Sequence, residues 1–182
     1  MEEYLIVSRG GQGGVTASRI LATAAVIEGK YAQAIPQFGA ERRGAIVRSY
    51  LRVSTEPIRR HCQVQNPSGV AVFSSRILDL VDPKSFNAVE GAKMVINSAK
   101  PRKVEGFRVF YVDATKIALD LGLVIAGWAV VNTAMAGAMA RVFGISSLDS
   151  LLKAMEEYFR GRLLELNQEA ARRAWNQVSE VG

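Results

Sequence analysis

The first quarter of the chain passes from a short apolar run to a segment of helical periodicity. Residues 4–7 are apolar and long enough for a buried strand, and apolar residues then recur at helical spacing from Val15 to Ala24. A glycine-rich turn at residues 10–14 separates the two segments. Because a strand, a glycine turn and a helix form the opening unit of a parallel α/β sheet, we expect a strand over 1–8 and a helix over 12–28.

Similar segments continue along the chain. The pattern predicts strands over 31–35, 45–53, 69–73, 92–97 and 107–112, and helices over 75–81, 114–121, 127–143, 148–158 and 162–178. Strands and helices interleave in the first two thirds, and helices dominate the last third. We therefore predict one α/β domain over 1–182, a Rossmann-like, doubly wound and mostly parallel sheet with a helical C-terminal part.

One stretch has no charge at all. Residues 121–140 are long enough to cross a bilayer, but glycines, Asn132 and Thr133 interrupt the stretch, and large aliphatic side chains are sparse. We predict instead a small-residue helix over 127–143, buried in the protein or at an interface, with Trp128 packed there. A buried Asn132 needs a hydrogen-bond partner, which we expect within the chain.

Composition narrows the function classes. The chain has 182 residues, a formal charge of +6 and a pI of about 9.7, which suits an acidic protein, a phosphate-bearing ligand or nucleic acid. His61 and Cys62 are the only histidine and cysteine, so no disulfide or metal site is expected, and Cys62 is expected to be packed. The first 15 residues lack the basic start of a signal peptide, which predicts a cytoplasmic protein.

Residues 39–62 hold most of the excess positive charge. This segment contains six arginines, Arg42, Arg43, Arg48, Arg52, Arg59 and Arg60, but only two glutamates, Glu41 and Glu56. Guanidinium groups fork onto carboxylates and phosphates. The segment is therefore a candidate contact for an acidic protein, a phosphate group or a nucleic-acid backbone, and the alternative is a solvated strand face.

The glycine turn is the second candidate site, comprising Gly11, Gln12, Gly13 and Gly14. Glycines permit positive φ and close approach, and free N–H groups at the following helix favour an anion. Counted from Gly11, however, the dinucleotide fingerprint fails at Thr16, and no acidic residue follows the second strand. A tight turn packed against a neighbouring chain remains the alternative. No catalytic residue set stands out.

Several blocks resemble one family across nearly the whole chain. R-G-G-Q-G-G at 9–14 is similar to the opening of the gamma subunit of 2-oxoacid:ferredoxin oxidoreductases. So are Y-A-Q-A-I-P-Q-F-G-A-E-R-R-G-A at 31–45, V-S-T-E-P-I at 53–58, V-V-N-T-A-M at 130–135 and L-N-Q-E-A-A at 166–171. The blocks occur in the family's order, and the second is the most specific.

The resemblance implies a non-catalytic subunit of an enzyme that converts a 2-oxoacid and coenzyme A to acyl-CoA and CO2 while reducing ferredoxin. It implies that alpha, beta and delta subunits hold the thiamine diphosphate, Mg²⁺ and iron–sulfur clusters, and that this chain holds none. The glycine turn would face coenzyme A, and Arg42 and Arg43 would lie at a subunit seam or reach an acidic group there.

The resemblance also implies gamma–gamma or gamma–alpha contacts, with the uncharged helix packed against a sister subunit, and no nucleic-acid or membrane contact. The choice among pyruvate, 2-oxoglutarate and branched-chain oxoacids would belong to the other subunits. A stand-alone nucleotide-binding protein and a basic nucleic-acid-binding module are the alternatives.

Overall fold

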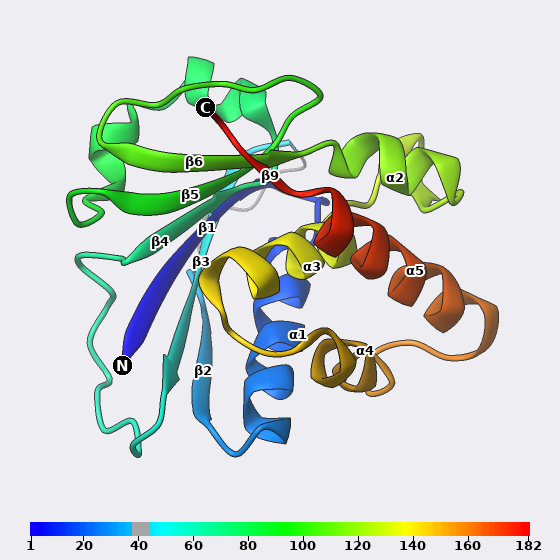
Figure 1. Ribbon diagram of the computed structural model, residues 1–182, viewed down its shortest axis with the longest axis horizontal. Helices are drawn as coiled ribbons and strands as arrows, with labels where there is room; N and C mark the ends of the chain where they lie inside the picture. Colours follow the sequence, from blue (N-terminus) through cyan, green and yellow to red (C-terminus); the bar gives the residue numbers. More distant parts are fainter. Residues whose placement is uncertain (38–43) are drawn as a thin grey trace.

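The structure is a computed structural model that describes residues 1–37 and 44–182, built on a mixed β-sheet with helices stacked against it (Figure 1). In the described part the sheet order is β2-β3-β1-β4-β5-β6-β9, and β7 and β8 form a separate hairpin. The strands are β1 (Glu2–Arg9), β2 (Tyr31–Pro36), β3 (Ile46–Ser54), β4 (Gly69–Val72), β5 (Ala92–Asn97), β6 (Phe107–Val112), β7 (Val124–Ile125), β8 (Trp128–Ala129) and β9 (Ser179–Glu180). The helices are α1 (Gly14–Ile27), α2 (Ala114–Asp120), α3 (Asn132–Phe143), α4 (Leu148–Met155) and α5 (Gly161–Gln177), with 3₁₀ helices η1 (Ser75–Asp79) and η2 (Pro83–Phe86).

The centre of the sheet is parallel. Strands β1, β4, β5 and β6 pair in parallel, whereas β3 pairs antiparallel with β1, β2 pairs antiparallel with β3, and β9 pairs antiparallel with β6. The central strands are near-continuous apolar runs because both of their faces are covered. This confirms the predicted α/β class with a mostly parallel central sheet.

Two apolar layers hold the sheet. In β1, Tyr4 and Ile6 point into a large core shared with α1, α3, α4 and α5. Leu5 and Val7 point to the other face, into a smaller core with η1 and η2. Successive strand residues alternate between faces, so one short apolar run serves both layers. The second layer consists of 3₁₀ turns, and the predicted helix over 75–81 is the five-residue η1.

The predicted helix over 127–143 begins later than expected, at Asn132. Residues 124–129 form the β7–β8 hairpin instead, because Ala126 and Gly127 both take positive φ angles, 50° and 82°, and turn the chain back. Trp128 is consequently 57% exposed and does not lie in the core. β9 was not predicted, because two residues are too short for a periodic pattern.

Helix α3 is covered by its own chain, which corrects the expectation that it packs against a sister subunit. Ten of its twelve residues are buried. A Cβ atom at Gly137 would overlap the carbonyl oxygen of Ala171 on α5, so the small residue lets the two helix backbones touch. Thr133 Oγ1 donates to Asn167 Oδ1 over 2.8 Å, and Asn132 Oδ1 accepts from Thr133 N, which confirms the predicted intrachain partner.

Arg52 is a structural residue rather than part of a solvated strand face, which corrects that alternative at this position. Its side chain is 1% exposed, and its Nε donates to Glu3 Oε1 over 2.7 Å. Its Nη atoms donate to the carbonyl oxygens of Arg60 and Cys62, over 3.4 and 2.5 Å. One guanidinium group therefore ties β1 and β3 to the following loop. Cys62 itself is exposed, so the prediction of a packed cysteine is wrong.

Glu28, just beyond α1, helps to begin α4. Its Oε1 accepts from Ser147 N over 2.6 Å, and its Oε2 lies 3.3 Å from Lys30 Nζ. Desolvation opposes ionisation of this carboxyl group, but hydrogen bonds from Ser147, Ser150 and Lys30 outweigh it and lower the pKa of Glu28 from 4.5 to about 2. The carboxylate therefore stabilises the fold above pH 4.5, and this stability is lost as the pH falls toward 2.

We expect Glu28→Gln to lower the free energy of unfolding by about 1 kcal/mol at pH 7, because a partly exposed charged cap is replaced by a neutral one. The difference from the parent chain should shrink toward zero near pH 2. Urea unfolding at both pH values measures it, with the exposed Glu157→Gln as the control. An equal loss at both pH values would contradict the assignment.

Candidate functional site

A polar crevice opens where the four parallel strands end. It has a volume of about 610 Å³. Its wall includes Arg9 at the end of β1, Ser74 and Arg76 after β4, Asn97 at the end of β5, and Asp113, Thr115 and Lys116 after β6, together with Gln12, Ser75, Ser98, Ala99, Leu119, Asp120, Trp128, Ala129 and Val131. Ligands of open α/β sheets bind outside the carboxyl ends of the strands. The crevice is therefore the candidate site.

The floor of the crevice is held by two side-chain amides that share one carbonyl group. Gln12 Nε2 and Asn97 Nδ2 donate to Phe73 O, over 3.3 and 2.9 Å. Gln12 Oε1 accepts from Arg9 N over 2.7 Å, and Asn97 Oδ1 accepts from Thr115 N over 3.2 Å. The connections after β1, β4, β5 and β6 are thereby fixed to one another, which gives the site a preorganised base.

The four glycine-turn candidates have different surroundings. Gly13 takes φ 79° at the start of α1, and a Cβ atom there would lie 2.8 Å from Asn132 Cβ. A Cβ atom on Gly14 would lie 2.5 Å from Ser8 Oγ, whereas Gly11, with φ 94°, has no atom within 4 Å of that position. Of the four, only Gln12 lines the crevice. Packing within the chain accounts for Gly13 and Gly14, and Gly11 lies in open space.

The other two candidates, Arg42 and Arg43, lie outside the described residues. The residues that follow them return to the glycine turn. Gly10 N donates to Ala45 O over 2.8 Å, and Gly44 N donates to Gly10 O over 3.4 Å.

Two arginines give the crevice its available positive charge. Arg9 and Arg76 line it and form no ion pair with any described residue. Lys116, by contrast, lies 2.6 Å from Asp120; this hydrogen bond and the carboxylate charge raise the pKa of Lys116. Asp113 accepts from Lys116 N and caps α2. Guanidinium groups without an ion-pair partner in the described ranges suit an anionic group.

The residues predicted from the sequence do not include Arg9, Asn97 or Arg76, which line the crevice. Asn97 could have been found, because it is the single polar residue at the end of the otherwise apolar run M-V-I-N at 94–97. A polar residue that closes a buried parallel strand faces the carboxyl edge of the sheet. Arg76 carries no comparable signal, since it lies in a 3₁₀ turn of mixed composition.

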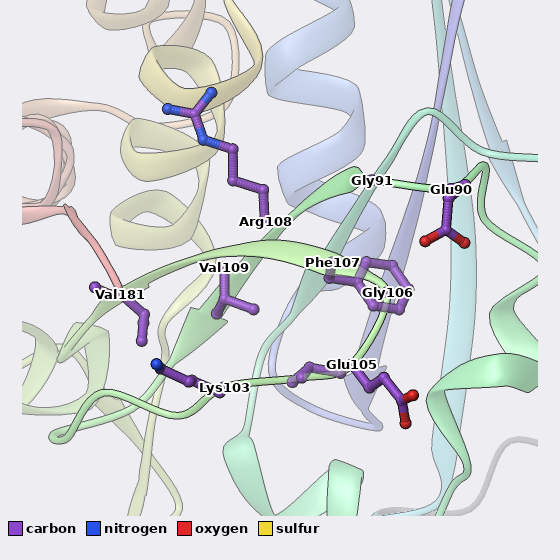
Figure 2. A pocket seen from close by; sticks show the side chains of 11 residues that line it. Glu90, Gly91, Lys103, Glu105, Gly106, Phe107, Arg108, Val109 and Val181 are labelled. Atoms are coloured by element: carbon purple, nitrogen blue, oxygen red, sulfur yellow. The ribbon is translucent and has the colours of Figure 1, made fainter.

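A second cavity of about 720 Å³ lies at the opposite edge, near the amino ends of β5 and β6 (Figure 2). Val109 and Val181 lie along it, with the charged residues Lys103 and Glu105 on the preceding loop (Figure 2). The loops that carry ligand contacts in such sheets do not lie at this edge. In the described ranges there is no group of three potential metal ligands, and no helix is long and apolar enough to span a bilayer.

We expect Gly13→Ala to lower the free energy of unfolding by about 2 kcal/mol, because the methyl group would meet Asn132 at a residue that already has positive φ. Gly11→Ala adds the same group in open space, so only backbone strain of about 1 kcal/mol should remain. Thermal or urea unfolding of the two variants compares them directly. Equal losses would show that contact with Asn132 does not constrain the turn.

The fold places the chain in the class of Rossmann-like α/β proteins with a mostly parallel central sheet. The chain belongs to the pyruvate ferredoxin/flavodoxin oxidoreductase family, whose sequence model matches residues 3–177. The chain is 44% identical to pyruvate synthase subunit PorC of Methanothermobacter marburgensis, and the match covers 100% of both chains. It is 41% identical to the pyruvate/ketoisovalerate oxidoreductases common subunit gamma of Thermococcus kodakarensis, over 98% of this chain and 97% of that one.

A solved structure agrees with the sequence relatives. The crystal structure of pyruvate oxidoreductase subunit PORC from Thermotoga maritima superposes with a TM-score of 0.83 at 34% identity, covering 100% of this chain and 98% of that one. The family resemblance drawn from the sequence blocks is thereby confirmed.

Proposed function

We propose that this chain is the gamma subunit of a multi-subunit 2-oxoacid:ferredoxin oxidoreductase. Such an enzyme oxidatively decarboxylates a 2-oxoacid with coenzyme A, giving acyl-CoA and CO2, and passes two electrons to ferredoxin. The observation that carries the proposal is full-length similarity above 40% identity to proteins named as subunits of pyruvate and ketoisovalerate oxidoreductases. We place the complex in the cytoplasm.

In this proposal the chain supplies structure and binding rather than electron transfer. An iron–sulfur cluster needs several cysteine ligands, and the chain has only Cys62. We therefore assign the clusters to partner subunits and, from the family resemblance, propose that the alpha, beta and delta subunits also hold the thiamine diphosphate and Mg²⁺. The side chains of the crevice floor are already engaged in internal hydrogen bonds, which suits positioning a bound group rather than reacting with it.

We further propose that coenzyme A, the anionic substrate, approaches the crevice. Arg9 and Arg76 offer two guanidinium groups that no described carboxylate occupies, and their geometry suits phosphate oxygens.

Reconstitution tests the proposed function. The chain is co-expressed with the candidate alpha, beta and delta subunits, and 2-oxoacid-dependent ferredoxin reduction is measured with and without it. The chain should copurify with the complex, and the isolated chain should show no turnover. Turnover by the isolated chain, or an unchanged complex in its absence, would contradict the proposal.

Paired arginine variants test the coenzyme A contact. Arg9→Ala/Arg76→Ala should raise the KM for coenzyme A at least about tenfold while leaving the KM for the 2-oxoacid unchanged, because two charge-assisted contacts are lost. Arg42→Ala/Arg43→Ala tests the subunit seam through assembly and coenzyme A affinity. Arg59→Ala/Arg60→Ala is the matched control. A normal KM for coenzyme A in both Arg9→Ala/Arg76→Ala and Arg42→Ala/Arg43→Ala would exclude the contact with coenzyme A.

A further inference from the structure

The β7–β8 hairpin and the end of α2 carry an exposed apolar patch. Leu119 is 55% exposed, Ile125 69% and Trp128 57%. These three residues, here called the hairpin patch, fall within ten positions of the chain. Isolated exposed apolar side chains are ordinary, but a contiguous patch of a few hundred Å² marks an interaction site.

The patch is presented on a firmly anchored support. Ile125 pairs with Trp128 across the hairpin, and Leu123 N and Val130 N close its base by donating to Ala118 O and Leu123 O, each over 2.8 Å. Leu123 is itself buried. The support therefore holds Ile125 and Trp128 outward in the free chain, and a preorganised surface loses little conformational entropy on binding.

We propose that the hairpin patch is a docking site for a different subunit of the oxidoreductase, one that offers an apolar hollow bordered by acidic side chains. The proposal rests on the proposed function for the existence of that subunit. Trp128 suits the role of anchor, because buried tryptophans dominate interface energies. The acidic border follows from the formal charge of +6 on this chain, which an acidic surface on the partner complements.

Charge argues against a second copy of this chain as the occupant. Copies related by a two-fold axis would bring the same patch against itself. Each copy also carries a formal charge of +6, so like charges would oppose one another. A partner with acidic residues around an apolar hollow removes that repulsion and covers the patch.

Docking at this position would also close the crevice. Leu119 and Trp128 belong both to the hairpin patch and to the crevice wall. A chain seated on the patch therefore lies across the mouth of the crevice, and a group bound inside would be enclosed between two subunits. The patch thus links assembly to the binding site.

Tryptophan fluorescence follows docking directly. The chain has two tryptophans, Trp128 and the half-buried Trp175, so Trp175→Phe leaves Trp128 as the single reporter. In the isolated chain its emission should be that of a hydrated indole and should be quenched by acrylamide. Adding the complex that lacks this chain should shift the emission to shorter wavelength and lower the quenching several-fold.

Substitutions then test the energy of the contact. Trp128→Ala should weaken assembly about 30-fold or more, as expected for a central anchor residue, and Ile125→Ser should weaken it to a smaller extent. Leu163→Ser is the matched control, since Leu163 is 52% exposed on α5 outside the patch. Circular dichroism checks that each variant is folded.

The outcomes separate the two proposals. If the parent chain joins no complex, the proposed function fails and this inference fails with it. If the parent chain assembles and folded Trp128→Ala assembles equally tightly, only the docking site is excluded. A concentration-dependent emission shift in the isolated chain, with dimers in sedimentation, would assign the patch to a second copy and overturn the inference.

Discussion

Gly137→Ala should destabilise the protein by about 3 kcal/mol, although alanine is the better helix former. In an open helix position the change would add about 1 kcal/mol of stability. Here the new methyl group would overlap the carbonyl oxygen of Ala171, which belongs to the backbone of α5 and cannot rotate away. Helices α3 and α5 must therefore separate, and the packing of the large core is lost along their contact.

Helix propensity alone predicts that Gly137→Ala stabilises the protein, whereas contact between α3 and α5 predicts that it destabilises it. Urea unfolding of Gly137→Ala measures it, and Gly11→Ala, which adds the same group with no atom within 4 Å, serves as the control. For a chain of this length, the loss corresponds to a fall in Tm of roughly 6–12 °C. A stability equal to or above that of the parent chain would show that α3 and α5 do not approach as closely as described.

Arg52→Met should lower the free energy of unfolding by about 3–5 kcal/mol, because it removes one member of a buried ion pair. The Glu3 carboxylate, whose side chain is only 15% exposed, would lose its partner at 2.7 Å. The carbonyl oxygens of Arg60 and Cys62 would lose a donor as well. The loop after β3 should therefore loosen first, and hydrogen exchange in residues 55–63 should report it.

Arg48→Met is the matched control on the same strand. The Arg48 guanidinium lies over the Phe86 ring at 5.7 Å from its centroid, a contact worth about 1 kcal/mol. The double variant Glu3→Gln/Arg52→Met should lose less than the sum of the single variants, since neither charge is then left alone. Strict additivity, or equal losses for Arg48→Met and Arg52→Met, would contradict the role given to Arg52.

The sequence predicts the fold best where periodicity is long and uninterrupted. The strands at 92–97 and 107–112 are found at the predicted residues, because each is a largely apolar segment between polar turns. The helix predicted over 127–143 fails at its start, since Ala126 gives no local signal that it takes positive φ. The hydropathy of residues 127–131 predicts a helix, but the turn at Ala126 and Gly127 makes the chain form the β7–β8 hairpin instead.

The site was predictable only in part. The glycine turn marks where the first strand meets its helix, but a sequence does not show that Gly13 is constrained by Asn132, more than a hundred residues later. The sequence does not distinguish Arg52 from the other five arginines of residues 39–62, because composition does not indicate that its guanidinium group is buried among backbone carbonyl groups. The family blocks added what physical pattern could not, namely that the chain functions with companion subunits.

The carbonyl group of Phe73 accepts hydrogen bonds from two side chains that belong to different connections of the sheet. Because Gln12 and Asn97 both donate to it, moving the connection after β1, β4 or β5 alone breaks at least one of these hydrogen bonds. We therefore expect the connections at the carboxyl edge to move together when a group binds there.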